Sequence, residues 1–206
     1  MSDAPDPAIE DIATNDSLRA TVRNVAVLNL GYFGIEFAVA VAIGSVSLFA
    51  DSVDFLEDGA INLLILAGLG FSVARRAKLG MLLAGIILVP GLATLWTAWQ
   101  NFSDGRVPDA IPLSLTGLGA FAVNLVCARL LAPFRATGGS LTKAAFLSAR
   151  NDVAANIAIV LAGLLTAGTA SRWPDLIVGL GIAALNAGAA VEIYQAARAE
   201  HVSAKP

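Results

Sequence analysis

The sequence has almost none of the side chains with which proteins form disulfides or bind soft metals. Cys127 is its one cysteine, and His201, in the polar C-terminal tail, is its one histidine. A single cysteine excludes an internal disulfide and a cysteine-based metal site, so any metal site within the apolar part of the chain must use oxygen ligands. Charge is also scarce, at 14% of 206 residues. No basic cluster is present, and we expect no nucleic acid partner.

Apolar residues make up 57% of the chain, which is too many for a soluble domain. We expect six stretches that can each cross about 30 Å of hydrocarbon as a helix, at 24–44, 47–73, 79–101, 110–132, 142–168 and 174–197. The fold class predicted is therefore an all-α membrane protein with six transmembrane helices. A polar tail over 1–23, a transmembrane domain over 24–198 and a short tail over 199–206 complete the chain, and we expect no cleaved signal peptide.

Lysine and arginine indicate the orientation of this domain. With a cytoplasmic N-terminus, the inner loops and tails hold ten of them, and the outer loops hold only Arg106 and Arg172. Cytoplasmic loops carry an excess of basic residues. Both termini are therefore predicted to be cytoplasmic. Trp96, Trp99 and Trp173 would then lie near the outer membrane surface.

The second apolar stretch contains four acids, Asp51, Asp54, Glu57 and Asp58. A carboxylate at the centre of a bilayer costs at least about 2.5 kcal/mol and must be paired, protonated or metal-bound. At about 100° per residue, Asp51, Asp54 and Asp58 share one face of a helix with Asn62, and Glu57 points elsewhere. This acidic stripe indicates a cation site.

The fifth apolar stretch carries the second polar group, in LSARNDVAAN. Ser148, Asp152 and Asn156 share one face within roughly 80°, and Asn151 flanks that face. Arg150 lies on the other side of the helix, where we expect it either to pair with a carboxylate of another helix or to extend to the inner membrane surface.

Two interpretations of these acids compete. In one, they are protonated or bound to Arg150 and only hold the helices together. In the other, which we favour because the acids outnumber the one nearby arginine, the second and fifth helices face each other and bind a divalent cation. Glu36 in the first helix, on one face with Asn29 and Tyr32, is predicted either to hydrogen-bond between helices or to act as a carboxylate of the water pathway.

The residues quoted resemble the cation diffusion facilitator (cation efflux) family of divalent-metal exporters. SLFADSVDFLED resembles the family's second helix, with Asp54 and Asp58 at its paired metal-binding positions and Asp51 just before them. LNLGYFGIEF, with Asn29 and Glu36, resembles the first helix, and the similarity covers residues 24–198. It implies six spans, cytoplasmic termini and a metal site between helices two and five.

Two departures from the family pattern are visible. Asp152 matches the fifth-helix acid, but Ser148 stands where a strong ligand is expected, and Asn151 offers an alternative oxygen. The family's C-terminal cytoplasmic domain is missing, so the chain resembles a short form, and a homodimer would have to assemble through the helices.

From the charge of such a carboxylate site we expect metal/proton antiport by alternating access, with a divalent cation and protons as substrates and no resident cofactor. Zinc is favoured by the resemblance, while manganese or iron suits an all-oxygen site better, and cobalt and cadmium stay open. Asp54, Asp58, Asp152, Asn151 and Ser148 are the predicted ligands. Asp51, Glu36, Glu57 and Asn156 are predicted to support the ligands or carry protons.

The expected location is a bilayer, the bacterial inner (plasma) membrane, in which the protein is a multi-pass integral component. An alternative function is a non-transporting membrane subunit that uses the acids for helix assembly. An intramembrane enzyme is not expected, because no nucleophile–base pair and no Gly-rich phosphate loop is present.

Overall fold

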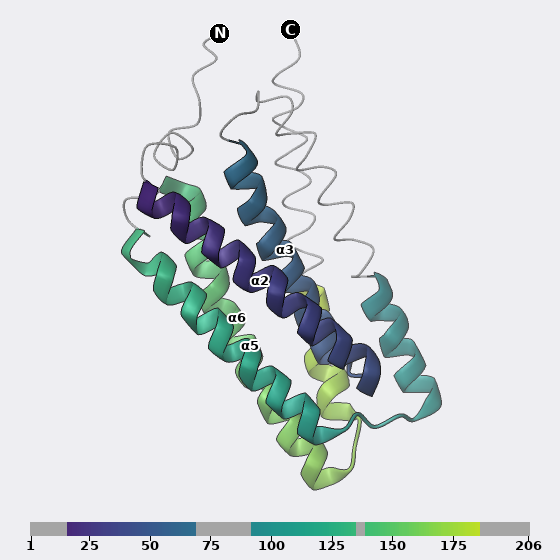
Figure 1. The fold of residues 1–206 in the computed structure, drawn as a ribbon. Helices are drawn as coiled ribbons and strands as arrows, with labels where there is room; N and C mark the ends of the chain where they lie inside the picture. Colours follow the sequence, from purple (N-terminus) through teal and green to yellow (C-terminus); the bar gives the residue numbers. More distant parts are fainter. Residues whose placement is uncertain (1–15, 69–91, 135–138, 186–206) are drawn as a thin grey trace, which may run out of the picture.

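The computed structural model of the protein describes residues 16–68, 92–134 and 139–185, and all regular structure within them is helical. The elements are α2 (Asp16–Ile43), α3 (Val46–Gly68), a helix over 92–104, α5 (Ala110–Leu131), the 3₁₀ turn η1 (Ala132–Phe134), α6 (Gly139–Thr169) and a helix over Trp173–Leu185 (Figure 1). The all-α class predicted from the sequence is confirmed.

Helix boundaries agree with the apolar stretches at most described ends. The main difference is α2, which begins at Asp16 instead of residue 24. Its extra turns carry Leu18 and Val22, which are buried against Ile61 and Leu66 of α3 and so extend the helix into the tail. Parts of the stretches 47–73, 79–101 and 174–197, and most of both tails, lie outside the described residues.

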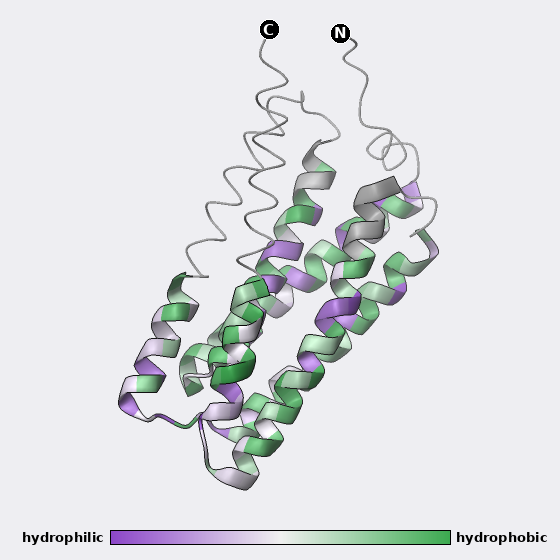
Figure 2. Ribbon diagram, turned by 180° about the vertical axis from the view of Figure 1, so that it is seen from behind, coloured by the Kyte–Doolittle hydropathy of each residue, from purple (hydrophilic) through white to green (hydrophobic). Residues whose placement is uncertain are grey.

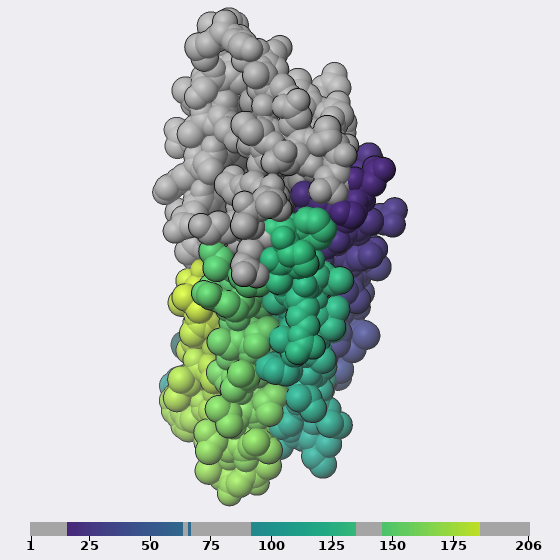
Figure 3. All heavy atoms as spheres, turned by 90° about the vertical axis from the view of Figure 1, so that its left-hand side faces the viewer, coloured from purple at the N-terminus to yellow at the C-terminus, as the bar shows by residue number. Residues whose placement is uncertain are grey.

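The helices run up and down in an antiparallel bundle that consists of two closely packed pairs. α2 packs along α3, α5 packs along α6, and α2 also contacts α5. Figure 3 shows α5 between α2 and α6 on one face, with the helix Trp173–Leu185 beside α6. Contact between α3 and α6, the helices with the acidic and polar faces, is much less extensive than contact within either pair.

Glycines allow the close approach of paired helices. A Cβ atom at Gly117 of α5 would lie 2.8 Å from Cγ2 of Ile159 in α6, and one at Gly59 of α3 would lie 2.6 Å from Cγ of Leu30 in α2. Small residues at helix contacts are typical of membrane bundles, where backbones must come close to gain dispersion contacts.

Three turns meet at the end of the bundle drawn lowest in Figure 1, which we call the turn end: residues 44–45, 105–109 and 170–172. Gly44 has a φ of +68°, which lets the chain reverse between α2 and α3. Its carbonyl accepts a hydrogen bond from the Asn101 side chain, and the Arg106 side chain lies against it.

The outer surface of the bundle is apolar. Within the described residues, three segments are long and apolar enough to cross a membrane, Asp16–Ile43, Ala110–Phe134 and Phe146–Thr169, and Trp173–Leu185 is a shorter apolar helix. Figure 2 shows hydrophobic residues along most of the ribbon, interrupted by polar positions. α3 has 23 residues and sufficient length, but its four acids set it apart from these spans. The count of six spans and the cytoplasmic termini stay predictions.

Candidate metal site

Polar side chains of α3 and α6 meet at two levels of the antiparallel pair. The Ser148 hydroxyl of α6 donates to Oδ1 of Asp58 in α3 at 3.1 Å. Farther toward the turn end, the Asn156 amide donates to both oxygens of Asp51, at 3.0 and 2.9 Å. Asp51 and Asn156 are fully buried. The predicted facing of the second and fifth spans is therefore found in the structure at both contacts.

Asp54 and Asp152 lie between these two levels. Asp54 is roughly one turn from Asp51 and one from Asp58, and Asp152 stands midway between Ser148 and Asn156 on α6. Both side chains are partly buried, and no hydrogen bond to either is found among the described residues. The central level thus has one carboxylate on each of the two helices.

A buried acid on α2 adjoins the stripe. The Glu36 carboxylate is completely buried, and neither of its oxygens has a hydrogen-bond donor within the described chain. It lies on the helix that packs along α3, which carries the stripe. Tyr32, one turn earlier, instead donates to the Thr116 carbonyl of α5 at 2.6 Å.

The other predicted residues take no part in the described hydrogen bonds between α3 and α6. The Asn151 side chain is exposed, in contrast to that of Ser148, and Arg150 is exposed as well. Glu57 is buried beside Asp58. The Asn62 amide donates to the Asp58 carbonyl of its own helix at 2.7 Å. Ser148, of the two alternatives, is thus the one in contact with an acid of α3.

Within the described residues, the acids do not already form a finished metal centre. No three His, Cys, Asp or Glu side chains there are grouped closely enough to hold one ion. The arrangement provides two carboxylates without donors, a third bound to a hydroxyl, and little packing between the helices that carry them.

A polar cluster at the turn end was missed by the sequence analysis. Asp175, in the helix Trp173–Leu185, is buried and accepts four hydrogen bonds, one from Ser45 and three from the first two residues of α3. The signal for it was modest: an acid just inside the sixth apolar stretch and a serine pair, Ser45 and Ser47, at the start of the second. Nothing in their spacing along the chain indicated that they meet.

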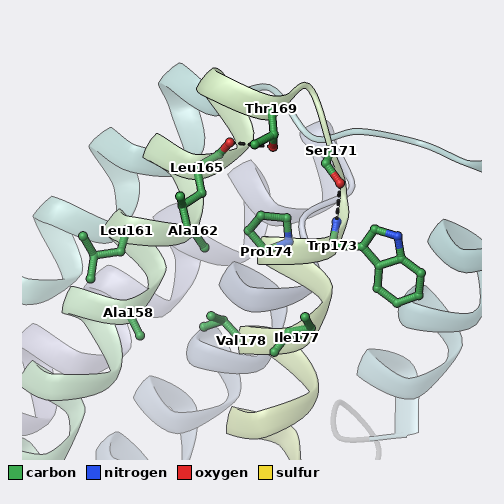
Figure 4. Close-up of a pocket in the computed structure, with 10 residues that line it drawn as sticks. All are labelled: Ala158, Leu161, Ala162, Leu165, Thr169, Ser171, Trp173, Pro174, Ile177 and Val178. Carbon is green, nitrogen blue, oxygen red and sulfur yellow. Dashed lines mark hydrogen bonds between the residues drawn. The ribbon is translucent and has the colours of Figure 1, made fainter.

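An apolar groove on the bundle is unsuited to an ion. It has a volume of about 550 Å³ and lies between α6 and the helix Trp173–Leu185. Figure 4 shows its aliphatic lining, including Leu161, Leu165 and Ile177, with Trp173 at one side. Of the polar atoms drawn there, the Trp173 backbone nitrogen donates to the Ser171 hydroxyl and the Thr169 hydroxyl donates to the Leu165 carbonyl.

Comparison with protein families decides the class of the protein. The family model described as the cation efflux transmembrane domain matches residues 22–198. The chain belongs to the cation efflux family. This match covers most of the chain and confirms the resemblance seen in the first, second and fifth apolar stretches.

Membership of the cation efflux family gives the general activity. The protein is an integral membrane cation transporter, and members of this family move divalent metal cations and are not enzymes. A comparison with curated protein sequences gives no match.

Proposed function

We propose that the protein exports a divalent metal cation from the cytoplasm in exchange for protons, and that Asp54, Asp58 and Asp152 bind the cation. The observation that carries this proposal is the pair of hydrogen-bonded contacts between α3 and α6, with Asp54 and Asp152 at the level between them and without donors among the described residues. Carboxylates in an apolar bundle need a compensating charge, which a divalent cation or protons can supply.

The fourth ligand we propose is the Ser148 hydroxyl. In the structure it donates to Asp58, and a hydroxyl also has lone pairs with which to accept or coordinate. When an ion binds Asp58, the hydroxyl can rotate and offer an oxygen from the adjacent position. Exposed Asn151 is less well placed for this role.

An oxygen-only ligand set bears on the choice of metal. Carboxylates and hydroxyls suit Mn²⁺ and related hard cations, whereas imidazole, which is absent from this site, suits Zn²⁺. Zinc also accepts carboxylates at about 2.0–2.2 Å. We therefore propose a transition-metal cargo, with zinc and manganese as the two ions to compare first.

Proton exchange follows from the charge of the proposed site. Three carboxylates with one divalent ion leave a charge of about −1, and the same acids after release would carry too much negative charge for an apolar bundle. Protons from outside would neutralise the empty site and return with it to the inner face. Glu36 and Asp51 are both fully buried on helices that pack together, and Glu36 has no donor in the described chain, so we assign this pair to the proton route.

The decisive experiment uses purified protein in liposomes with a pH gradient. For protein inserted with its cytoplasmic side outward, an acidic lumen should drive accumulation of metal inside. Asp58→Asn and Asp152→Asn should each reduce this uptake to the level of protein-free liposomes, because a neutral amide neither attracts a divalent cation nor exchanges a proton.

Asp104→Asn is the matched control, since Asp104 is an exposed acid outside the stripe. Its uptake should equal that of the unmodified protein. Calorimetric metal titrations of the same proteins separate transport from assembly. Unchanged uptake in folded Asp58→Asn or Asp152→Asn would remove the proposed site, and full metal uptake without proton release would remove the antiport.

A further inference from the structure

The helix Trp173–Leu185 is attached to the beginning of α3 through one buried carboxylate. Asp175 Oδ2 accepts from the Val46 backbone nitrogen at 2.8 Å, and Oδ1 accepts from the Ser47 nitrogen at 3.2 Å. The Ser45 and Ser47 hydroxyls each donate to Oδ1 at 2.6 Å. Asp175 is 1% exposed, so these four bonds replace the solvation that its charge has lost.

This contact also completes the N-terminus of α3. The first N–H groups of a helix have no partner within the helix and carry its positive dipole end. Here Val46 and Ser47 donate to Asp175, and Leu48 donates to the Ser45 hydroxyl at 3.2 Å. An acid from a different helix therefore supplies most of the capping of the helix that bears the acidic stripe.

Gly179 brings the two backbones together one turn after Asp175. A Cβ atom there would lie 2.6 Å from the Ser47 nitrogen and 2.6 Å from the Val46 carbonyl carbon. Since these are backbone atoms, no side chain can rotate away to make room. Asp175 and Gly179 thus form one docking face, which holds the first turn of α3 through hydrogen bonds to the Asp175 carboxylate and through close backbone packing at Gly179.

α3 packs closely along α2, and the Asp175 contact links its first turn to the helix that follows α6. α3 contacts α6 only sparsely, whereas the helix with Asp175 follows α6 in the chain through the short turn 170–172. A fixed first turn determines the height of Asp54, about 12 Å farther along the axis, and of Asp58, about 18 Å along it. The docking face therefore fixes how α3 stands against α6.

We infer that Asp175 is a positioning residue, which holds α3 at the height where Asp54 and Asp58 stand opposite Asp152 and Ser148. The inference rests on the proposed metal site for its functional consequence, but not for the docking itself. A residue that acts only as a helix cap would affect the stability of α3 and leave the alignment of the folded protein unchanged.

The test combines a metal-free distance measurement with a metal titration. Spin labels at Leu63→Cys of α3 and Leu161→Cys of α6, both exposed positions, are introduced in a Cys127→Ala background. Asp175→Asn keeps the shape of the side chain but loses the second acceptor oxygen and the charge. We expect the distance distribution between the labels to broaden or shift, and the affinity for Mn²⁺ or Zn²⁺ to fall by about 10- to 100-fold.

Gly179→Ala reaches the same contact by a different route, because it leaves the carboxylate intact and separates the backbones. Ser47→Ala is the mildest variant and removes one of the four donors. Both should shift the distance and the affinity in the same direction as Asp175→Asn, and they decide the matter if Asp175→Asn does not fold. Asp104→Asn, an exposed acid near the turn end, should change neither.

A lower unfolding temperature with an unchanged distance distribution in these variants would overturn the inference and leave Asp175 as a cap alone. An altered distance with wild-type metal affinity would overturn its role in positioning the site. If the unmodified protein binds neither metal, the proposed function fails, and the distance measurement still decides whether Asp175 holds α3 in place.

Discussion

Asp51, Asp54 and Asp58 have different neighbours, although their spacing places all three on one face of α3. Asp51 is bound by an amide, Asp58 by a hydroxyl, and Asp54 by no donor among the described residues. The partners come from α6, so the differences arise from tertiary packing. These differences in hydrogen bonding would let a carrier bind its cation at one level of the stripe in preference to the others.

Ser148→His should convert the site toward zinc. Ser148 already contacts Asp58, and an imidazole there would add the nitrogen ligand that Zn²⁺ favours. We expect tighter binding of Zn²⁺ with little gain for Mn²⁺, measured by calorimetric competition. Asn151→His is the matched control, because its side chain is exposed and should give no gain. Equal gains from the two substitutions would contradict the assignment of Ser148.

The sequence predicted the acidic stripe well because helical periodicity depends only on local geometry. Asp51 and Asp58 do lie on the side of α3 that meets Ser148 and Asn156. The choice between Ser148 and Asn151 was left open, because residues three apart differ by only about 60° on a helix and either can flank a site. The Asp175 contact joins residues about 130 positions apart, which periodicity cannot detect.

Among the elements, α5 and α6 form the most closely packed pair, and glycine permits their contact. The methyl group missing at Gly117 leaves space for Ile159, a β-branched residue that rotates little within a helix. Where the structure describes them, the helices follow the predicted apolar stretches at most ends, because long apolar stretches are a local signal. The early start of α2 at Asp16 was not foreseen, since its added turns are stabilised by contacts with α3 that a local pattern does not contain.

Gly117→Ala should destabilise the bundle, because its Cβ atom would have to displace Ile159, and overpacking of this kind costs about 1–3 kcal/mol. Gly168→Ala on α6 meets nothing within 4 Å and should be neutral or stabilising, as alanine is the better helix former. Thermal unfolding in detergent can be followed by a thiol-reactive dye, since Cys127 is buried in the folded protein. A higher midpoint for Gly117→Ala than for Gly168→Ala would contradict this packing.

In the whole molecule, the three turns of the turn end are joined by contacts of their side chains. Arg106 lies against Gly44, and Arg172 lies against Gly105 and over the Phe102 ring, 5.8 Å from its centroid. These are the two arginines that the charge distribution assigned to the outside. The antiparallel arrangement requires the turns to share one end, and the distribution of basic residues predicts which side of the membrane that end faces.

Cysteine labelling in intact cells tests this orientation. In a Cys127→Ala background, Val107→Cys at the turn end should react with a membrane-impermeant maleimide, because Val107 is exposed. Arg19→Cys near the start of α2 should react only after the membrane is permeabilised. The opposite pattern would place the turn end in the cytoplasm and reverse the direction of the proposed transport.

The two hydrogen bonds from Asn156 to Asp51 affect which acid of α3 a cation can bind. An ion that takes Asp51 as a ligand must first displace an amide from both of its oxygens, whereas Asp54, about one turn away, has no such bonds among the described residues. The amide therefore weakens Asp51 as a competitor for the cargo. Because Asn156 satisfies Asp51, the neighbouring Asp54 is left as the acid more available to bind the ion in the proposed site.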